Sequence, residues 1–303
     1  MSTSGSIVAP RPSRWRRIFS PANIGSVAVG VIVFILAVGW WDTHLGAVAA
    51  AAVSALITGI TWVVWWTLTK PTDLSSVVLS PLLGTVPVAA TPSPALASPR
   101  SAPARAYLAA ADHLEENTTG HLLLVSSPVP GQGASTVALN LAISATRSGR
   151  KVVLIDGDVA SEGLSRFGHT EPTPGLIELA AGEATLAEAS RLWTLDPDSR
   201  LPFIPSGATD RTDKATLLRS AQLARAIDEL SEHADLLLID TAPVNWNGAA
   251  APLAAHADGT VLVVSDGAET ESITATRERL EEVGAPVIGY VVNRTGDVTD
   301  RPV

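Results

Sequence analysis

The sequence predicts an α/β fold in which a mostly parallel sheet is flanked by helices, preceded by a two-helix transmembrane hairpin. Three observations support this fold class. Two long apolar stretches without charge lie near the N-terminus, short apolar runs alternate with helical patterns after residue 120, and a glycine-rich turn joins the first of these runs to a helix. The first observation predicts the membrane hairpin, and the other two predict the α/β domain.

The composition excludes several classes of protein. A formal net charge of -9 repels the phosphates of nucleic acids, so no nucleic-acid partner is expected. Cysteine is absent, which excludes disulfides, thiolate zinc sites and a cysteine nucleophile. The six histidines are scattered without the spacing of metal ligands. Any metal in this protein should therefore be held by oxygen atoms.

Two transmembrane helices are predicted, from Ile24 to Trp41 and from Leu45 to Leu68. They would be about 27 Å and about 36 Å long, so each can cross a hydrocarbon core of roughly 30 Å. A cleaved signal peptide fits less well, because a second and longer apolar stretch follows the first almost at once. The remaining alternative is a pair of buried core helices. Tryptophans towards the span ends argue against it, because indole rings favour the headgroup region.

The basic residues predict the orientation of this hairpin. Four arginines precede the first span and Lys70 follows the second, whereas the turn between the spans has none. Both termini should therefore be cytoplasmic. The expected organisation is a cytoplasmic tail over 1–22, the hairpin over 23–69, a linker rich in proline, alanine and serine over 70–105, and a cytoplasmic α/β domain over 106–303.

Short apolar runs define the strands expected in this domain. Leu122–Ser127 and Lys151–Asp156, with a helical pattern over Thr136–Arg147 between them, predict a βαβ unit with a parallel pair of strands. Further strands are expected at 203–205, 236–240, 260–265 and 287–292, and amphipathic helices at 217–233 and 271–283. Such a sheet binds its ligands beyond the carboxyl ends of the strands.

The turn from Ser127 to Thr136 has the form of a phosphate-binding loop. Its glycines allow backbone N–H groups to surround an anion, and the following helix N-terminus adds positive potential. Position 134 should then be the lysine that contacts the β- and γ-phosphates, but it is alanine. A loop of glycine and proline alone is more often a tight turn. The nucleotide-binding residues expected here are Gly131, Gln132, Gly133, Ala134, Ser135 and Thr136.

Carboxylates follow two of the expected strands. Asp156 and Asp158 end the second strand, and Asp240 ends the run at 236–240. Carboxylates at these ends can hold Mg²⁺ and its water shell and can orient an attacking water, with the Ser135 hydroxyl as a further ligand. A single acidic residue at a strand end is more often a helix cap, but three at matching ends favour a shared site.

The order of these motifs resembles the bacterial tyrosine kinases and polysaccharide co-polymerases of capsule and exopolysaccharide synthesis, within the deviant Walker-motif P-loop ATPases. The likeness covers about residues 106–295 and includes SSPVPGQGAST, VVLIDGDVAS, LLLIDTAPV and VIGYVVNR; LLGTVPV at 82–88 is similar to a segment after the second span of these proteins. The resemblance implies a P-loop NTPase-like fold and ATP with Mg²⁺. It places metal near Ser135, Asp156 and Asp240, a catalytic role on Asp158, and adenine near Asn293.

The chain departs from the pattern of this family in four places. Ala134 replaces the lysine, Ala160 replaces an arginine, Ala242 replaces a proline, and the C-terminus lacks the tyrosine cluster that is autophosphorylated in the family. Loss of one preorganised donor costs roughly 2.7–4 kcal/mol of transition-state stabilisation. Lys70, Lys151 and Arg147 are expected to lie out of reach of the phosphates, and Lys214 stays open as a replacement.

The leading hypothesis is a membrane-anchored, catalytically degraded protein that regulates cell-surface polysaccharide assembly. Its expected partners are polysaccharide polymerase or export proteins, an active homologue or further copies of itself. One alternative is an active tyrosine kinase or ATPase that receives the missing cation in trans. Another is a membrane-bound positioning protein akin to partition ATPases, against which permanent anchoring argues.

Overall fold

The computed structural model describes residues 55–62 and 74–295, except 92, 162, 168–169, 198, 209 and 247–249. The chain divides into two compact units, Met1–Pro71 and Thr72–Val303. In the first unit, residues 55–62 are helical. Within the described ranges, no helix has the length and apolar character needed to cross a bilayer. The predicted span 24–41, and all of 45–68 apart from 55–62, lie outside those ranges, so the hairpin stays a prediction.

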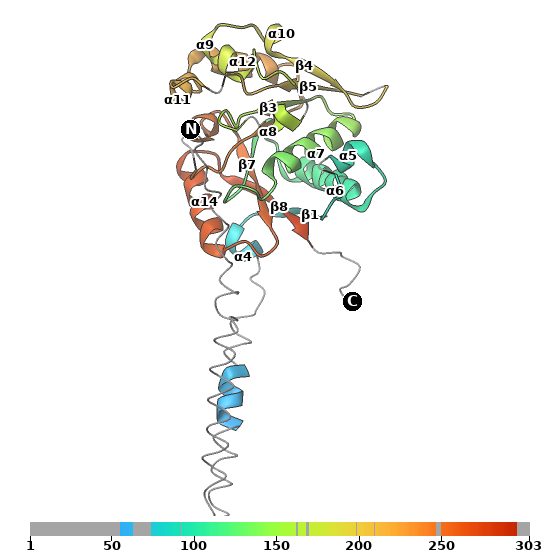
Figure 1. Ribbon diagram of the computed structural model, residues 1–303, viewed down its shortest axis with the longest axis vertical. Helices are drawn as coiled ribbons and strands as arrows, with labels where there is room; N and C mark the ends of the chain where they lie inside the picture. The colour runs from blue at the N-terminus through green and yellow to red at the C-terminus, as the bar shows by residue number, and fades with distance from the viewer. Residues whose placement is uncertain are drawn as a thin grey trace, which may run out of the picture. The chain divides into compact units, whose positions relative to one another are not determined.

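An eight-stranded sheet forms the centre of the second unit (Figure 1). Its spatial order is β1-β8-β7-β2-β6-β3-β5-β4, and all neighbours are parallel except β4 and β5. This confirms the predicted mostly parallel sheet, and each of the six strands expected from the sequence has a counterpart in β2, β3, β5, β6, β7 or β8. The strands are β1 (Leu82–Pro87), β2 (Leu122–Ser126), β3 (Val152–Asp156), β4 (Arg191–Thr194), β5 (Arg200–Ile204), β6 (Leu236–Asp240), β7 (Gly259–Ser265) and β8 (Val287–Thr295).

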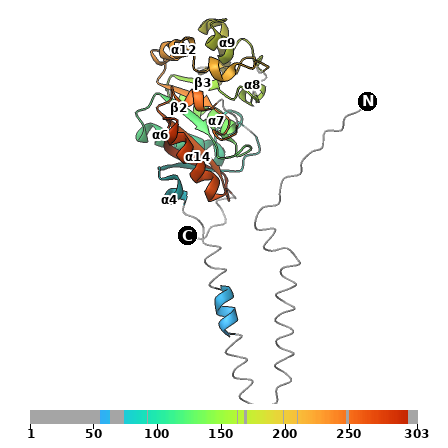
Figure 2. The ribbon, with the colours of Figure 1, turned by 90° about the vertical axis from the view of Figure 1, so that its left-hand side faces the viewer.

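Helices cover both faces of this sheet, as Figures 1 and 2 show from two sides. One face carries α5, α6 and α7, whereas α4, α9, α12, α13 and α14 pack on the other. Burial on both faces explains why β2, β3 and β6 are continuous apolar runs. The helices are α4 (Leu74–Val78), α5 (Pro94–Ala97), α6 (Ala102–Asn117), α7 (Ala134–Arg147), α8 (Gly163–Phe167), α9 (Leu176–Ala181), α10 (Leu186–Ala189), α11 (Lys214–Leu217), α12 (Ala221–Ser231), α13 (Ala250–Ala254) and α14 (Thr270–Glu282).

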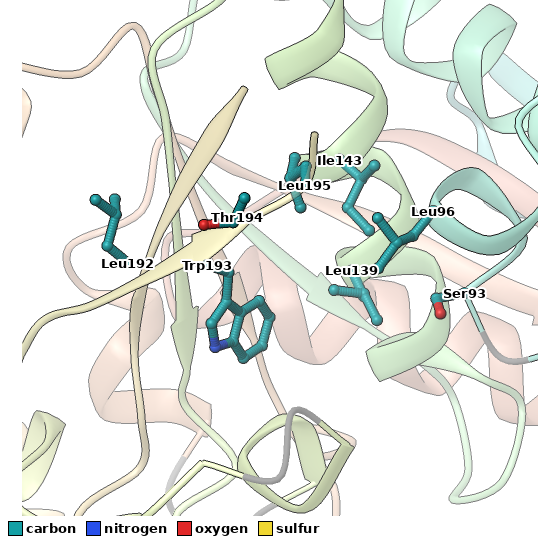
Figure 3. Close-up of a pocket in the computed structure, with 8 residues that line it drawn as sticks. All are labelled: Ser93, Leu96, Leu139, Ile143, Leu192, Trp193, Thr194 and Leu195. Atoms are coloured by element: carbon teal, nitrogen blue, oxygen red, sulfur yellow. The ribbon is translucent and has the colours of Figure 1, made fainter. Parts of the chain in front are cut away.

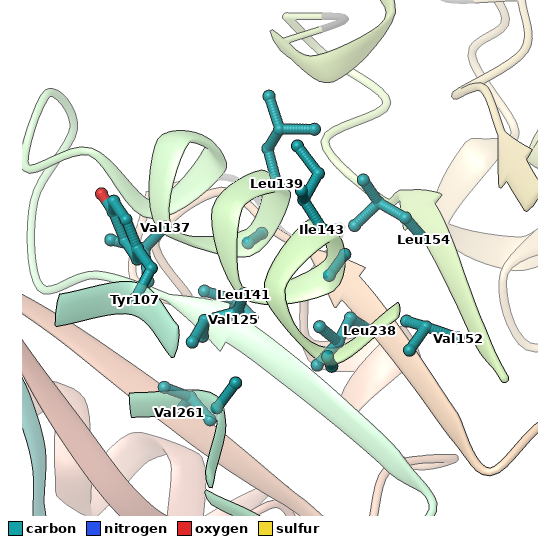
Figure 4. Packing of buried hydrophobic residues seen from close by; sticks show 14 of the residues in the cluster. Tyr107, Val125, Val137, Leu139, Leu141, Ile143, Val152, Leu154, Leu238 and Val261 are labelled. Atoms are coloured by element: carbon teal, nitrogen blue, oxygen red, sulfur yellow. The ribbon is translucent and has the colours of Figure 1, made fainter. Parts of the chain in front are cut away.

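Helix α7 lies at the centre of the larger core. Figure 4 shows Leu141 of this helix next to Val125 on β2 and Val137 next to Tyr107 on α6, and Leu238 on β6 belongs to the same cluster. Ten consecutive or near-consecutive positions of α7 are buried, from Ala134 to Ala145. The loop between β2 and α7 is therefore anchored at both ends by close-packed elements, which limits how far it can move.

The predicted βαβ unit needs one correction. β2 and β3 are parallel, but they do not pair with each other, because β6 lies between them and pairs with both. Asp240 at the end of β6 consequently stands beside Asp156 at the end of β3, and beside Val125 on β2. The strand order thus brings together acidic residues that are 84 positions apart in the chain.

The predicted linker over 70–105 was wrong for the part that the structure describes. β1 joins the sheet by pairing with β8, and α6 begins at Ala102, with the Ser101 hydroxyl accepting the N–H of Ala104. Leu83 and Val86 are buried, and a Cβ at Gly84 would lie 2.9 Å from the Ala110 Cβ. A few apolar residues in a stretch rich in proline and alanine are therefore enough to dock this edge strand on α6.

Two further differences concern the region between β3 and β6. The helix expected over 217–233 is interrupted, because the Ser220 hydroxyl accepts the N–H of Leu223 and starts a new helix, α12. β4 was not predicted from the sequence. It forms an antiparallel edge with β5, where Trp193 stacks on Phe203 at a centroid distance of 4.0 Å.

Because β1 packs into the domain, two adjacent leucines on this strand should contribute differently to the free energy of unfolding. Leu83 is fully buried, whereas 46% of Leu82 is exposed. Leu83→Ala is expected to lower the free energy of unfolding by about 2–5 kcal/mol, because it leaves a cavity in the core. Leu82→Ala is the matched control, expected to stay within about 1 kcal/mol of the parent. Urea unfolding of both variants checks this, and equal small losses would show that β1 is not packed.

Candidate functional site

The loop between β2 and α7 forms one wall of a cavity of about 270 Å³. Gly131 and Gly133 have φ of 84° and 93°, which is the left-handed region that favours glycine. Gly133 is the N-cap of α7, and as a glycine it has no side chain that could bond the first N–H groups of that helix. These donors are therefore available to an anion. The lining residues are Ser127, Pro130, Gly131, Gly133, Ala134, Ser135, Thr136, Asp158, Ser161, Thr241, Ala242, Pro243 and Arg294.

A buried asparagine holds this loop in place. The Asn293 Nδ2 donates to the Gln132 carbonyl at 2.9 Å, so the end of β8 is tied to the loop. A Cβ at Gly133 would overlap the same Nδ2 atom, which leaves no room for a side chain there. The family resemblance implies that Asn293 lies near adenine. Its side-chain amide is bonded to the loop, and it also lines a second cavity described below.

Two buried carboxylates lie behind Ser135. Asp156 and Asp240 face each other across β3 and β6 and are both fully buried. Burial raises the pKa of Asp156 to about 6, partly opposed by Ser165, whose N–H and hydroxyl donate to its Oδ2 at 2.9 and 2.8 Å. Burial raises the pKa of Asp240 well above its usual value, and the neighbouring charge of Asp156 raises it further. Ionising both groups is therefore unfavourable unless a cation joins them.

The residues present fit a divalent cation. Neither carboxylate oxygen of Asp240 has a hydrogen-bond partner among the described residues. A Cβ at Gly163 would stand 3.2 Å from the Ser135 Oγ and 3.9 Å from the Asp240 Oδ2, so glycine leaves space between them. No cluster of three or more histidine, cysteine or acidic ligands occurs in the described ranges. A cation here would thus take protein ligands from Asp240, Ser135 and Asp156, and complete its shell with water or phosphate oxygens.

Asp158 lines the cavity, and its carboxylate accepts hydrogen bonds from a neighbouring residue of the same turn. It accepts the Ser161 N–H at 3.3 Å and also the Ser161 hydroxyl. The interaction closes the turn that follows β3, which is the structural role common for such residues. Ser161 lines the cavity and was not predicted. Its signal in the sequence is only its distance of three residues from an aspartate.

A basic side chain other than the expected lysine lines the cavity. Ala134 lines the wall and is 9% exposed. Lys214, left open by the sequence, donates from its Nζ to the Val159 carbonyl at 3.0 Å, and it is not among the lining residues. Arg147 pairs with Asp196 at 3.3 Å, away from the loop. Arg294 does line the cavity. The sequence places it beside Asn293 after the last expected strand, but nothing in the pattern indicates that it supplies a cation to the loop.

A second cavity of about 290 Å³ adjoins the first and shares Thr136 and Arg294 with it. Its other walls come from the segment after β1, from Tyr107 on α6 and from Asn293. Residues 87–91, within the region expected to be a linker, thus line one of the two adjoining cavities. Together the two cavities extend from the loop to the Tyr107 side chain.

Another cavity lies at the β4 edge of the sheet. Figure 3 shows its lining, with Trp193 and Leu195 facing Leu139 and Ile143 of α7. Its volume is about 380 Å³, and no charged side chain lines it. It has no means of holding phosphates, so the loop cavity is the better candidate for a nucleotide.

Comparisons with known proteins agree with this geometry. No family model matches the chain. It is 30% identical over 175 residues to the tyrosine-protein kinase CpsD of Streptococcus pneumoniae serotype 4, covering 57% of this chain and 75% of CpsD. It is 28% identical over 192 residues to the succinoglycan biosynthesis transport protein ExoP of Rhizobium meliloti, covering 61% of this chain and 24% of ExoP. The kinase domain of the Escherichia coli tyrosine kinase ETK has the same fold, with a TM-score of 0.69 and 19% identity over 78% of this chain and 98% of that chain.

Proposed function

The chain belongs to the bacterial tyrosine kinases of capsule and exopolysaccharide synthesis, and within that family we propose that it is a membrane-anchored, catalytically degraded member. It binds a nucleotide with Mg²⁺ and regulates polysaccharide assembly instead of transferring phosphate. The observation that carries this proposal is Ala134, which lines the cavity where the family has a lysine. Without that ammonium group the terminal phosphate lacks a preorganised charge partner, at a cost of roughly 10²–10³ in rate.

The tyrosines support loss of kinase function independently. The chain has two, Tyr107 and Tyr290, and they are only 1% and 4% exposed. Burial raises the pKa of the Tyr107 hydroxyl, which keeps it protonated. Neither hydroxyl is accessible to a kinase while the domain is folded. The chain therefore offers no tyrosine for the autophosphorylation that its family carries out on a C-terminal cluster.

Nucleotide binding is the part of the function that the site retains. Phosphates would take the N–H groups of the loop and of the first turn of α7, and the nucleoside would take the adjoining cavity. A bound Mg²⁺ would neutralise phosphate charge and join the buried carboxylates. Ser135 and Asp240 would hold this ion, with Asp156 beside them.

Anchoring and partners belong to the same proposal. The charge-free stretches 24–41 and 45–68 support a hairpin in the inner membrane, with both termini in the cytoplasm. A regulator held there would act through the surface of its P-loop domain on a polysaccharide polymerase, an exporter or an active homologue. Carbonate extraction of bacterial membranes tests the anchor, since a spanning chain stays in the pellet and a peripheral one is released.

Turnover by the full chain in detergent tests the proposed loss of catalysis. Phosphate release and tyrosine phosphorylation are measured with MgATP over a hundredfold range of protein concentration. We expect neither activity at a rate typical of kinases, at any concentration. Turnover that rises steeply with concentration would instead favour a cation supplied in trans by another copy. Ordinary turnover that is independent of concentration would overturn the proposal.

A further inference from the structure

The charge balance of the loop cavity poses a question about its ligand. Among its lining residues in the described chain, two side chains are ionisable, Asp158 and Arg294. Asp156 and Asp240 add buried carboxyl groups behind Ser135. A nucleotide brings further negative charge, which one cation must help to balance in the absence of a lysine at position 134.

The backbone of β8 presents this arginine in an unusual way. Val86 of β1 pairs with Asn293, and the next residue, Pro87, pairs with Thr295, so Arg294 is the extra residue of a β-bulge. Its φ of 59° lies in the left-handed region, which is uncommon for a side chain other than asparagine, aspartate or glycine. Bulges re-aim side chains and are frequent beside functional sites. Strain held at such a position is a reason to look for a function there.

The neighbours of Arg294 fix its position relative to the loop. Asn293, directly before it, is bonded to the Gln132 carbonyl, so the bulge and the loop are held together. Arg294 and Tyr107 both line the adjoining cavity, and the charge of Arg294 lowers the pKa of Tyr107 against the larger effect of burial. Arg294 therefore stands at the junction of the two cavities, where phosphates would meet the nucleoside.

We infer that Arg294 is the phosphate-binding cation of this chain and takes over the charge neutralisation that the missing loop lysine would provide. The inference rests on the proposed nucleotide binding. A guanidinium group can donate two parallel hydrogen bonds to a phosphate. Because Arg294 comes from β8 and not from the loop, it binds phosphates close to the nucleoside and leaves the terminal phosphate without a basic side chain. Binding without efficient transfer follows from that placement.

Calorimetric titration of MgADP into the full chain in detergent tests this role. Arg294→Gln is expected to weaken binding by about 10- to 100-fold, the range of a charge-assisted contact. Arg294→Lys should recover part of the loss. Arg279→Gln, an exposed arginine on α14, is the matched control and should bind as the parent does. Raising the salt concentration should weaken binding by the parent more steeply than binding by Arg294→Gln, because one charge pair is gone.

A double variant tests whether Arg294 stands in for the lysine. In an Ala134→Lys background, Arg294→Gln is expected to lose less affinity than in the parent, because both cations lower the charge repulsion within one polyphosphate chain. Equal losses in both backgrounds, or no loss in the parent, would overturn the inference. It would also be overturned if the parent bound no nucleotide. If the chain hydrolysed ATP or phosphorylated tyrosine at an ordinary kinase rate and its binding still depended on Arg294, the proposed loss of catalysis would be wrong and this inference would hold.

Discussion

Ala134→Lys is expected to raise the affinity for MgATP by about 10- to 100-fold, as one charge-assisted phosphate contact would. The wall at this position faces the cavity, and the loop around it is already fixed by Asn293 and by the packing of α7. A lysine at position 134 would therefore bind phosphate in a preformed loop, and ordering the loop would cost little conformational entropy. Calorimetry of the parent and the variant side by side measures the gain.

The control for this variant is a lysine placed elsewhere on the domain. Ala109 is exposed on α6, away from the loop, so Ala109→Lys adds the same charge without reaching the cavity. It should leave the affinity unchanged. If the two variants gained equally, the effect would come from overall charge. If Ala134→Lys gained nothing, phosphate would not lie against this loop.

Asp240→Asn is expected to stabilise the metal-free protein and to abolish its response to Mg²⁺. Burial and the charge of Asp156 raise the pKa of Asp240, so ionising it in the folded state is unfavourable. Each unit by which the pKa is raised corresponds to about 1.4 kcal/mol lost once the group is ionised. Asparagine removes that charge but also removes a metal ligand. Thermal melting at pH 8, with EDTA and then with Mg²⁺, measures both effects.

The two buried carboxyl groups also predict how the melting temperature of the metal-free protein changes with pH. A carboxyl whose pKa is raised on folding favours the folded state at low pH, and that advantage is lost as the pH rises through the folded pKa. For Asp156, with a pKa of about 6 against the usual 3.8, the loss falls between about pH 4 and pH 6. The metal-free parent should thus melt higher at pH 5 than at pH 8, and Asp240→Asn should show a smaller difference. Asp112→Asn, on the exposed side of α6, should behave as the parent does.

Much of the sheet could be predicted because its central strands are buried on both faces. Continuous apolar runs such as 236–240 have few other structural explanations, and the loop and carboxylates follow from where those runs end. Spatial order could not be read in the same way. Placing β6 between β2 and β3 depends on packing of whole elements, and no local pattern around Leu236 records it.

β1 shows why the rest was harder to predict. Only Leu83 and Val86 of this edge strand are buried, and they are surrounded by proline, alanine and serine, whose composition is typical of a linker. Arg294 is a similar case. Its position at the cavity depends on a bulge against β1, so Arg294 could not be assigned as a cation of this cavity before β1 itself was placed. In both cases the missing information was a contact between distant parts of the chain.

Equilibrium dialysis of the full chain against MgATP, followed by chromatography of the nucleotide on both sides, tests the central claim most directly. A site with the geometry of a phosphate loop but without its lysine should hold nucleotide and leave it unchanged. We expect an excess of nucleotide on the protein side, all of it intact ATP. No excess at millimolar concentration, or conversion of the ATP to ADP within the equilibration time, would contradict the account.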